Sequence, residues 1–149
     1  MSVDYDIELA PIRSGYDGET CWVHARAGSI PGAGRAGAPA MVMTMQKLLL
    51  SGSDVFYTIH DLRTDDMGGT WSGPTPHPGF GRWQEQGGIE ACVCDFTPKW
   101  HAPTGVLLGI GHTARYQDHS GPMAVRRREA AYAVYDEQAR TWSDARFLE

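Results

Sequence analysis

Apolar and polar residues alternate along most of the chain with a period of two. In "SDVFYTIHDLR", the side chains at 55, 57 and 59 share one face of an extended segment, and those at 56, 58 and 60 share the other. Both faces are largely apolar, which is typical of a strand inside a layered structure. The alternation recurs at 19–27, 38–50, 88–96, 104–116 and 128–136. The pattern predicts an all-β protein without a long helix.

Glycine and proline divide these segments. The chain has 149 residues, of which 18 are Gly and 9 are Pro, and this content favours many short strands joined by turns. Two stretches, 28–40 and 72–88, are predicted to be loops, the second unusually long for a connection without structure. With 42% hydrophobic residues, the chain has enough apolar material for one globular domain.

Charge and cysteine content exclude several classes of protein. A formal charge of −5 argues against nucleic acid as a partner, and the basic run at 126–128 is too short to change that. We see no secretory signal and no apolar segment of the roughly 20 residues needed to span a bilayer, so we expect a soluble protein, cytoplasmic by default.

The three cysteines are expected to be reduced. Cys92 and Cys94 in "ACVC" would share a strand face, where buried thiols are the simplest interpretation. No second cysteine pair is present, and His101 and His112 are not at zinc-finger spacing. We therefore expect no metal and no cofactor.

A repeat links the two halves of the chain. The segments "FYTIHDLRTDDMGGTWSGP" and "YAVYDEQARTWSDAR" share an order of alternating strand, acids in a turn, and then Thr, Trp and Ser. The tryptophans stand at positions 71 and 142. In the second copy Ala139 and Glu137 stand where the first has Gly and Asp, and Asp136 is displaced by one position.

The first copy resembles the Asp box of sialidases and related propellers, which reads Ser or Thr, any residue, Asp, any, Gly, any, Thr, Trp. The matching residues are Thr64, Asp66, Gly68, Thr70 and Trp71. The resemblance implies a turn between the third and fourth strands of a blade, on the rim away from the ligand. Physically, Asp66 can accept backbone N–H bonds, Gly68 can adopt a positive φ and Trp71 can anchor the turn.

The resemblance also implies an architecture of antiparallel four-stranded blades from a propeller of the six-bladed type. Residues 1–149 then form one incomplete propeller domain, with blades at about 20–75 and 89–145 and with residues 1–19 as an outer strand of a closing blade. Rings close with typically 4 to 8 blades. Further C-terminal blades or copies of the chain, as a homo-oligomer, are expected to complete the ring.

Asp54 is the catalytic residue that the resemblance implies. It precedes the box Asp66 by 12 residues, a position similar to that of the acid/base Asp of sialidases. The alternative is a turn or capping residue in "SGSD". The family's first arginine precedes an Ile-Pro pair, but here Ser29 stands before Ile30, with Arg26 or Arg35 as nearby substitutes.

Six further residues are predicted to bind the sugar. His24 and Arg26 alternate on one strand face, where they line a pocket or simply face solvent. The segment 95–112 supplies Asp95, Trp100, His101 and His112, and an aromatic ring beside a polar neighbour suits a pyranose. The alternative for this segment is a plain surface loop.

Two functions stay open. The first is a sialidase-like glycoside hydrolase that acts on a glycan, with Asp54 as proton donor, inactive as this short chain. The second is a non-catalytic carbohydrate-binding or structural propeller. An Asp box is specific for the turn and does not by itself fix an activity.

Overall fold

The computed structural model describes residues 4–52, 54–117, 123–125 and 127–148. In these ranges the protein is all-β, as predicted, and helix is limited to two short 3₁₀ turns, η1 (Arg35–Gly37) and η2 (Pro78–Phe80). The strands are β1 (Thr20–Ile30), β2 (Ala40–Leu49), β3 (Phe56–Thr64), β4 (Ser72–Pro76), β5 (Trp83–Gln84), β6 (Ile89–His101), β7 (Val106–Gln117), β8 (Met123–Val125), β9 (Ala130–Asp136), β10 (Thr141–Trp142) and β11 (Arg146–Leu148).

The first sheet is an antiparallel meander in the order β1-β2-β3-β4. The register of β2 and β3 shows which residues lie at each end of this sheet. Leu48 pairs with Phe56 at one end, and Met41 pairs with Thr64 at the other. The connection from β2 to β3, which carries Asp54, therefore lies at the opposite end of the sheet from the turn after Thr64.

The second sheet repeats this order. Its central path is β10-β9-β7-β6-β5, so that β6, β7, β9 and β10 form a second four-stranded antiparallel meander. Short β8 pairs with β7, and β11 pairs with β9. The sheet curls, and the curl brings the rings of Trp83 in β5 and Phe147 in β11 to 5.6 Å between centroids.

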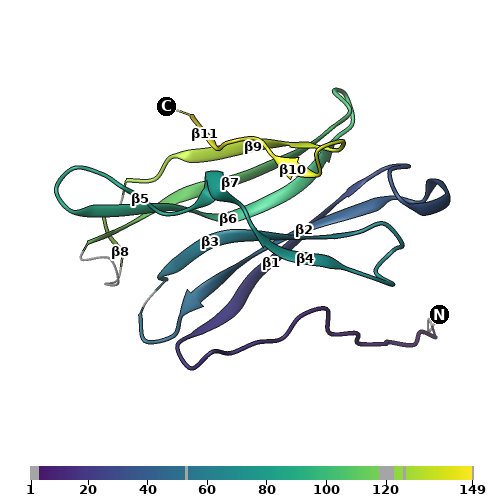
Figure 1. Ribbon diagram of the computed structural model, residues 1–149, viewed down its shortest axis with the longest axis horizontal. Helices are drawn as coiled ribbons and strands as arrows, with labels where there is room; N and C mark the ends of the chain where they lie inside the picture. Colours follow the sequence, from purple (N-terminus) through teal and green to yellow (C-terminus); the bar gives the residue numbers. More distant parts are fainter. Residues whose placement is uncertain (1–3, 53, 118–122, 126, 149) are drawn as a thin grey trace.

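The sheets meet face to face through β1 and β6, with the second sheet above the first in Figure 1. The main core between them contains Ile30, Val42, Ile59, Phe80, Val93, Phe96, Leu107, Ala131, Ala133, Tyr135 and Trp142. Packing is tight at Gly109, where an added Cβ would stand 2.0 Å from the Phe96 ring. Two buried polar side chains of β2 join the sheets: Thr44 donates to the Phe96 carbonyl at 2.6 Å, and Gln46 donates to the Val93 carbonyl at 2.8 Å.

The stretch 72–88 and the N-terminal arm can be compared with the expectations for them. The stretch 72–88 is not a structureless loop, because it contains β4, η2 and β5. Residues 4–15 form no strand; Tyr5, Ile7 and Leu9 are exposed, and Figure 1 shows this arm running beside the first sheet. The outer strand was expected to complete a blade outside this chain, so it stays a prediction.

Other features can be compared with the sequence directly. Cys21, Cys92 and Cys94 are free thiols, as expected. Within the described ranges, no helix has the length and apolar character needed to cross a bilayer. Of the basic run at 126–128, position 126 lies outside the described residues.

Candidate functional site

Two strand irregularities face each other where the sheets meet. The β1–β2 register shifts between Val23 and Arg26, and the β6–β7 register shifts between Cys94 and Thr97. Inside these bulges His24 has φ 56° and Asp95 has φ 53°, both in the left-handed region. A bulge re-aims a side chain, and a left-handed non-glycine residue stores strain, of order 1–3 kcal/mol.

The bulges bring together the residues that we call the bulge cluster: His24, Arg26, Cys94, Asp95 and His112. Asp95 is at its centre. Its Oδ1 lies 3.0 Å from His24 Nδ1 and 3.7 Å from Arg26, and its Oδ2 lies 3.9 Å from His112 Nε2. The closest of these contacts lacks hydrogen-bond alignment, so the buried Nδ1 of His24 has no hydrogen-bond partner although a carboxylate is beside it.

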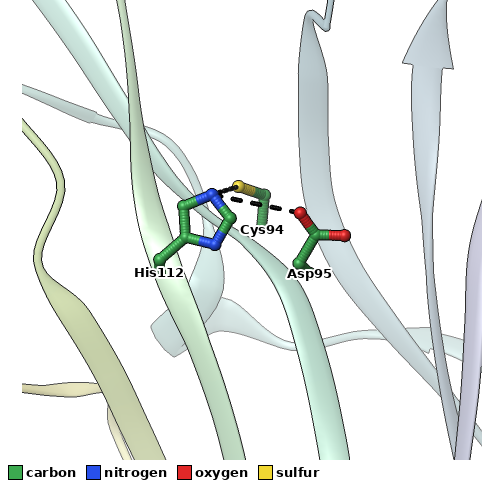
Figure 2. A group of neighbouring side chains, drawn as sticks. All are labelled: Cys94, Asp95 and His112. Atoms are coloured by element: carbon green, nitrogen blue, oxygen red, sulfur yellow. Dashed lines mark hydrogen bonds and ion pairs between the residues drawn. The ribbon is translucent and has the colours of Figure 1, made fainter. Parts of the chain in front are cut away.

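Cys94 and His112 form the second part of the cluster. They are paired in register across β6 and β7, and Cys94 Sγ lies 3.3 Å from His112 Nε2. Figure 2 shows the Cys94 sulfur and one Asp95 carboxylate oxygen both directed toward His112 Nε2. Burial, followed by the neighbouring Cys92 and Asp95, raises the pKa of the Cys94 thiol. Burial, followed by the positive charge of Arg128, lowers the pKa of His112.

Asp54 lies near this cluster. It has a left-handed φ of 53°, and its side chain is exposed. Its carbonyl accepts a 2.6 Å hydrogen bond from the Tyr116 hydroxyl, which in turn accepts from the Phe56 N–H at 3.0 Å. The Asp54 carboxylate also contributes to raising the pKa of Cys94. A buried tyrosine thus holds the backbone of the predicted acid in place.

Trp100 and His101 are not part of this arrangement. They end β6, five and six residues beyond Asp95, and His101 pairs with Val106. Trp100 lines a cavity of about 390 Å³ together with Ile30, Pro31 and Glu137. The structure therefore brings His24, Arg26, Asp95 and His112 together near Asp54, and places Trp100 and His101 at the opposite end of the sheets.

Ser29 also lies at that opposite end. It pairs with Met41, which in turn pairs with Thr64 at the start of the 64–70 turn. The resemblance puts the residue before Ile30 and the acid/base residue at the same ligand site, whereas here Ser29 and Asp54 lie at opposite ends of the first sheet, which disagrees with the resemblance. Arg26, three residues earlier in β1, is the basic residue that reaches the cluster.

The turn at 64–70 has Asp66 as its hydrogen-bond acceptor, as its residues predicted. Asp66 accepts bonds from the backbone N–H and the hydroxyl of Thr70, both at 2.8 Å, and from the Thr64 hydroxyl at 2.9 Å. These bonds, led by the Thr70 N–H, lower the pKa of Asp66 to about 2. Gly68 has φ 96°, and the partly buried Trp71 packs on Met43, Met45 and Leu62.

The second copy of the turn is built differently. Asp136 accepts from the N–H groups of Gln138 and Ala139 at 2.8 and 2.9 Å. Glu137 instead receives two bonds from Arg63, at 2.7 and 2.8 Å. Residues 63–70 together with Glu137 and Arg140 form what we call the turn region, which links the two sheets.

Another concave region borders the turn region. A cavity of about 370 Å³ is lined by Asp61, Arg63, His77, Tyr135 and six other residues. Burial raises the pKa of Asp61. His77 Nε2 lies 2.8 Å from the Trp142 carbonyl oxygen, and its Nδ1 accepts from the Gly79 N–H at 3.2 Å. The histidine therefore serves to join η2 to β10.

Sequence reasoning missed Cys94, Tyr116 and Arg128. Arg128 contacts His112 Nε2 directly. The alternation in "ACVC" indicated that Cys94 is buried, but no local signal showed that His112 lies opposite it, because that depends on the β6–β7 register.

Comparisons with protein-family models, with curated proteins and with solved structures found no match.

Proposed function

We propose that this chain forms two neighbouring blades of a sialidase-like propeller, and that Asp54 and the bulge cluster form part of its glycan site. The repeated four-stranded meander supports the blades, and the Asp66 turn, at the opposite end from Asp54, supports their orientation. The architecture alone would fit many activities. The site must be argued from its residues.

One observation carries the proposal. Among the described non-glycine residues with left-handed φ, His24 and Asp95 are the two that interrupt strands, and they face each other at 3.0 Å. Strain of this kind is concentrated at active sites and ligand clamps, where the surrounding structure maintains it. Both residues lie in the interior of their strands, His24 four residues from Thr20 at the Asp54 end of β1 and Asp95 at the middle of β6.

The chemistry of the cluster suits a sugar. Asp54 presents an exposed side chain at the position where the resemblance puts the acid/base residue. Asp95 is a second carboxylate, flanked by His24 and Arg26. These groups offer hydrogen-bond donors and acceptors to hydroxyls, and the half-exposed Arg26 guanidinium could also bind a sugar carboxylate.

Hydrolysis needs a proton donor and a nucleophile or base at a defined separation, about 5 Å in retaining enzymes. The family draws its nucleophile and remaining arginines from later blades. We therefore expect the 149-residue chain to bind a glycoside and to leave it intact.

The test pairs turnover with binding. The purified chain is incubated with a fluorogenic sialoside and with fluorogenic neutral glycosides, and binding of the matching methyl glycosides is followed by saturation-transfer NMR. We expect binding without release of the fluorophore. Turnover that is lost in Asp54→Asn would show that the site is complete in this chain. Absence of binding to every glycoside by the folded protein would overturn the proposal.

A further inference from the structure

Three side chains of different chemistry bring donor atoms together beside the β6 bulge. One ligand atom each from Cys94, Asp95 and His112 lie within 4.8 Å of one another. Figure 2 shows the three side chains directed toward a common space. We propose that they form a site for a divalent transition-metal ion, with Zn²⁺ as the best fit. This inference departs from the sequence-based expectation of no metal.

The separations suit zinc. Zinc bonds are about 2.3 Å to sulfur, about 2.0 Å to histidine nitrogen and about 2.1 Å to carboxylate oxygen, so a tetrahedral site separates its ligand atoms by roughly 3.3–3.6 Å. The distance from Cys94 Sγ to His112 Nε2 is 3.3 Å, and that from His112 Nε2 to Asp95 Oδ2 is 3.9 Å. The third separation, between Cys94 and Asp95, is at most 4.8 Å, so closing the site needs the Asp95 carboxylate to move by roughly 1 Å.

Asp95 is held in a way that supports ligation. Its Oδ1 faces His24 and Arg26, which leaves Oδ2 directed toward His112. Metal-binding side chains are commonly oriented by outer partners of this kind. The left-handed φ of 53° at Asp95 lets consecutive residues of one strand, Cys94 and Asp95, serve the same site instead of pointing to opposite faces.

The donor set selects the kind of ion. Sulfur and imidazole favour zinc and similar transition metals, whereas magnesium and calcium prefer oxygen ligands. Coordination by sulfur replaces the thiol proton, which passes to the buffer. The thiolate and the Asp95 carboxylate together balance the two positive charges of the ion. Three protein ligands leave a fourth position for water, as in catalytic zinc sites.

Arg128 would compete with a metal ion for His112 Nε2. Its guanidinium contacts His112 Nε2, and since a guanidinium offers only donors, that nitrogen is the acceptor in the contact. The lone pair that a metal ion would use is thus engaged by Arg128 in this structure. Arg128 is exposed, so it can turn toward solvent when an ion enters. Replacing Arg128 should therefore tighten metal binding.

The test is a titration of the reduced 149-residue chain with Co²⁺, without any sugar. We expect one equivalent to bind with a thiolate-to-cobalt charge-transfer band and the visible bands of a tetrahedral ion, all removed by Zn²⁺. Cys94→Ser should abolish the charge-transfer band. The matched control is Cys92→Ser, at a buried thiol two residues along the same strand, which should keep it. Arg128→Gln should bind cobalt several-fold more tightly.

The outcomes are separable from those of the glycan experiment, because neither measurement uses the other's ligand. A folded wild-type chain without a charge-transfer band would overturn the site. Loss of the band in Cys92→Ser with retention in Cys94→Ser would do the same. If circular dichroism shows that Cys94→Ser does not fold, His112→Gln takes its place, and an unchanged cobalt spectrum in that variant would contradict the proposal.

Discussion

The turn region and the bulge cluster hold their carboxylates in opposite ways. In the turn region, Asp66 accepts three bonds of 2.8–2.9 Å within one turn, and Glu137 is bound twice by Arg63. In the bulge cluster, Asp95 has only looser ionic contacts, from 3.0 to 3.9 Å, and its backbone is strained. The first arrangement satisfies its own groups and stabilises the fold. The second leaves polar atoms available to a ligand.

The largest expected effect on stability is in the turn region, at Arg63. Its side chain is 6% exposed and bonds to Glu137, Asp65 and Tyr135. Hydrogen bonds to charged groups contribute about 1.5–3 kcal/mol, so Arg63→Ala should lower the free energy of unfolding by about 2–3 kcal/mol. Urea unfolding measures this. The exposed Arg146→Ala should change it by less than about 0.5 kcal/mol, and equal effects of the two variants would contradict a special role for Arg63.

In the bulge cluster, loss of the Asp95 carboxylate should not lower the free energy of unfolding. Glycine adopts the left-handed conformation of Asp95 without strain, while the partly exposed ion pairs lost are weak. We expect Asp95→Gly to leave the free energy of unfolding unchanged or to raise it by up to about 1 kcal/mol. A loss of more than about 1 kcal/mol in urea unfolding would mean that the bulge stabilises the fold.

Removing the Asp66 carboxylate should affect stability without affecting a ligand. Asp66→Ala leaves the Thr70 N–H and the two threonine hydroxyls without their acceptor. We expect a lower thermal midpoint by circular dichroism, and unchanged glycoside affinity of the folded fraction at a temperature well below it. Loss of binding at full stability would move the site to the turn region.

The smallest expected effect is a pH dependence. Since its hydrogen bonds lower the pKa of Asp66 from 3.8 to about 2, the stability contributed by this carboxylate is present above pH 3.8 and is lost as the pH falls through about 2. The difference in thermal midpoint between wild type and Asp66→Asn should therefore shrink across this interval. A difference that is constant from pH 5 to pH 2 would show that the charge has no role in the turn.

The sequence predicted local structure better than it predicted the site. Alternation located β1, β2, β3, β6, β7 and β9, but β4 and β5 were missed because Gly and Pro obscure the period at 72–88. The Asp66 turn was predictable because its contacts lie within a few residues. Asp95 and His112 were predicted because the segment 95–112 contains many polar and aromatic residues. No local sequence pattern revealed that Asp95 contacts His24, which is 71 positions away and in the other sheet.

Trp100 and His101 show the limit of grouping residues by sequence proximity. They follow Asp95 closely in the chain, but β6 is 13 residues long. At about 3.3 Å per residue, five or six positions correspond to about 17–20 Å along the strand. The period of two gives the face of a residue in the regular parts of a strand and fails at the β1 and β6 bulges, and the site also depends on how far along the strand the residue lies.

The central claim is that ligand binding belongs to the bulge cluster and the neighbouring Asp54, away from the turn region. The most direct measurement is a ¹H–¹⁵N correlation spectrum of the labelled chain, titrated with methyl glycosides that bind it, in the presence of a chelator that removes metal ions. We predict that the amide signals of His24, Asp54 and Asp95 shift with ligand concentration, while those of 63–70 and 136–141 stay in place. Shifts confined to 63–70 and 136–141, with His24, Asp54 and Asp95 unchanged, would contradict the account.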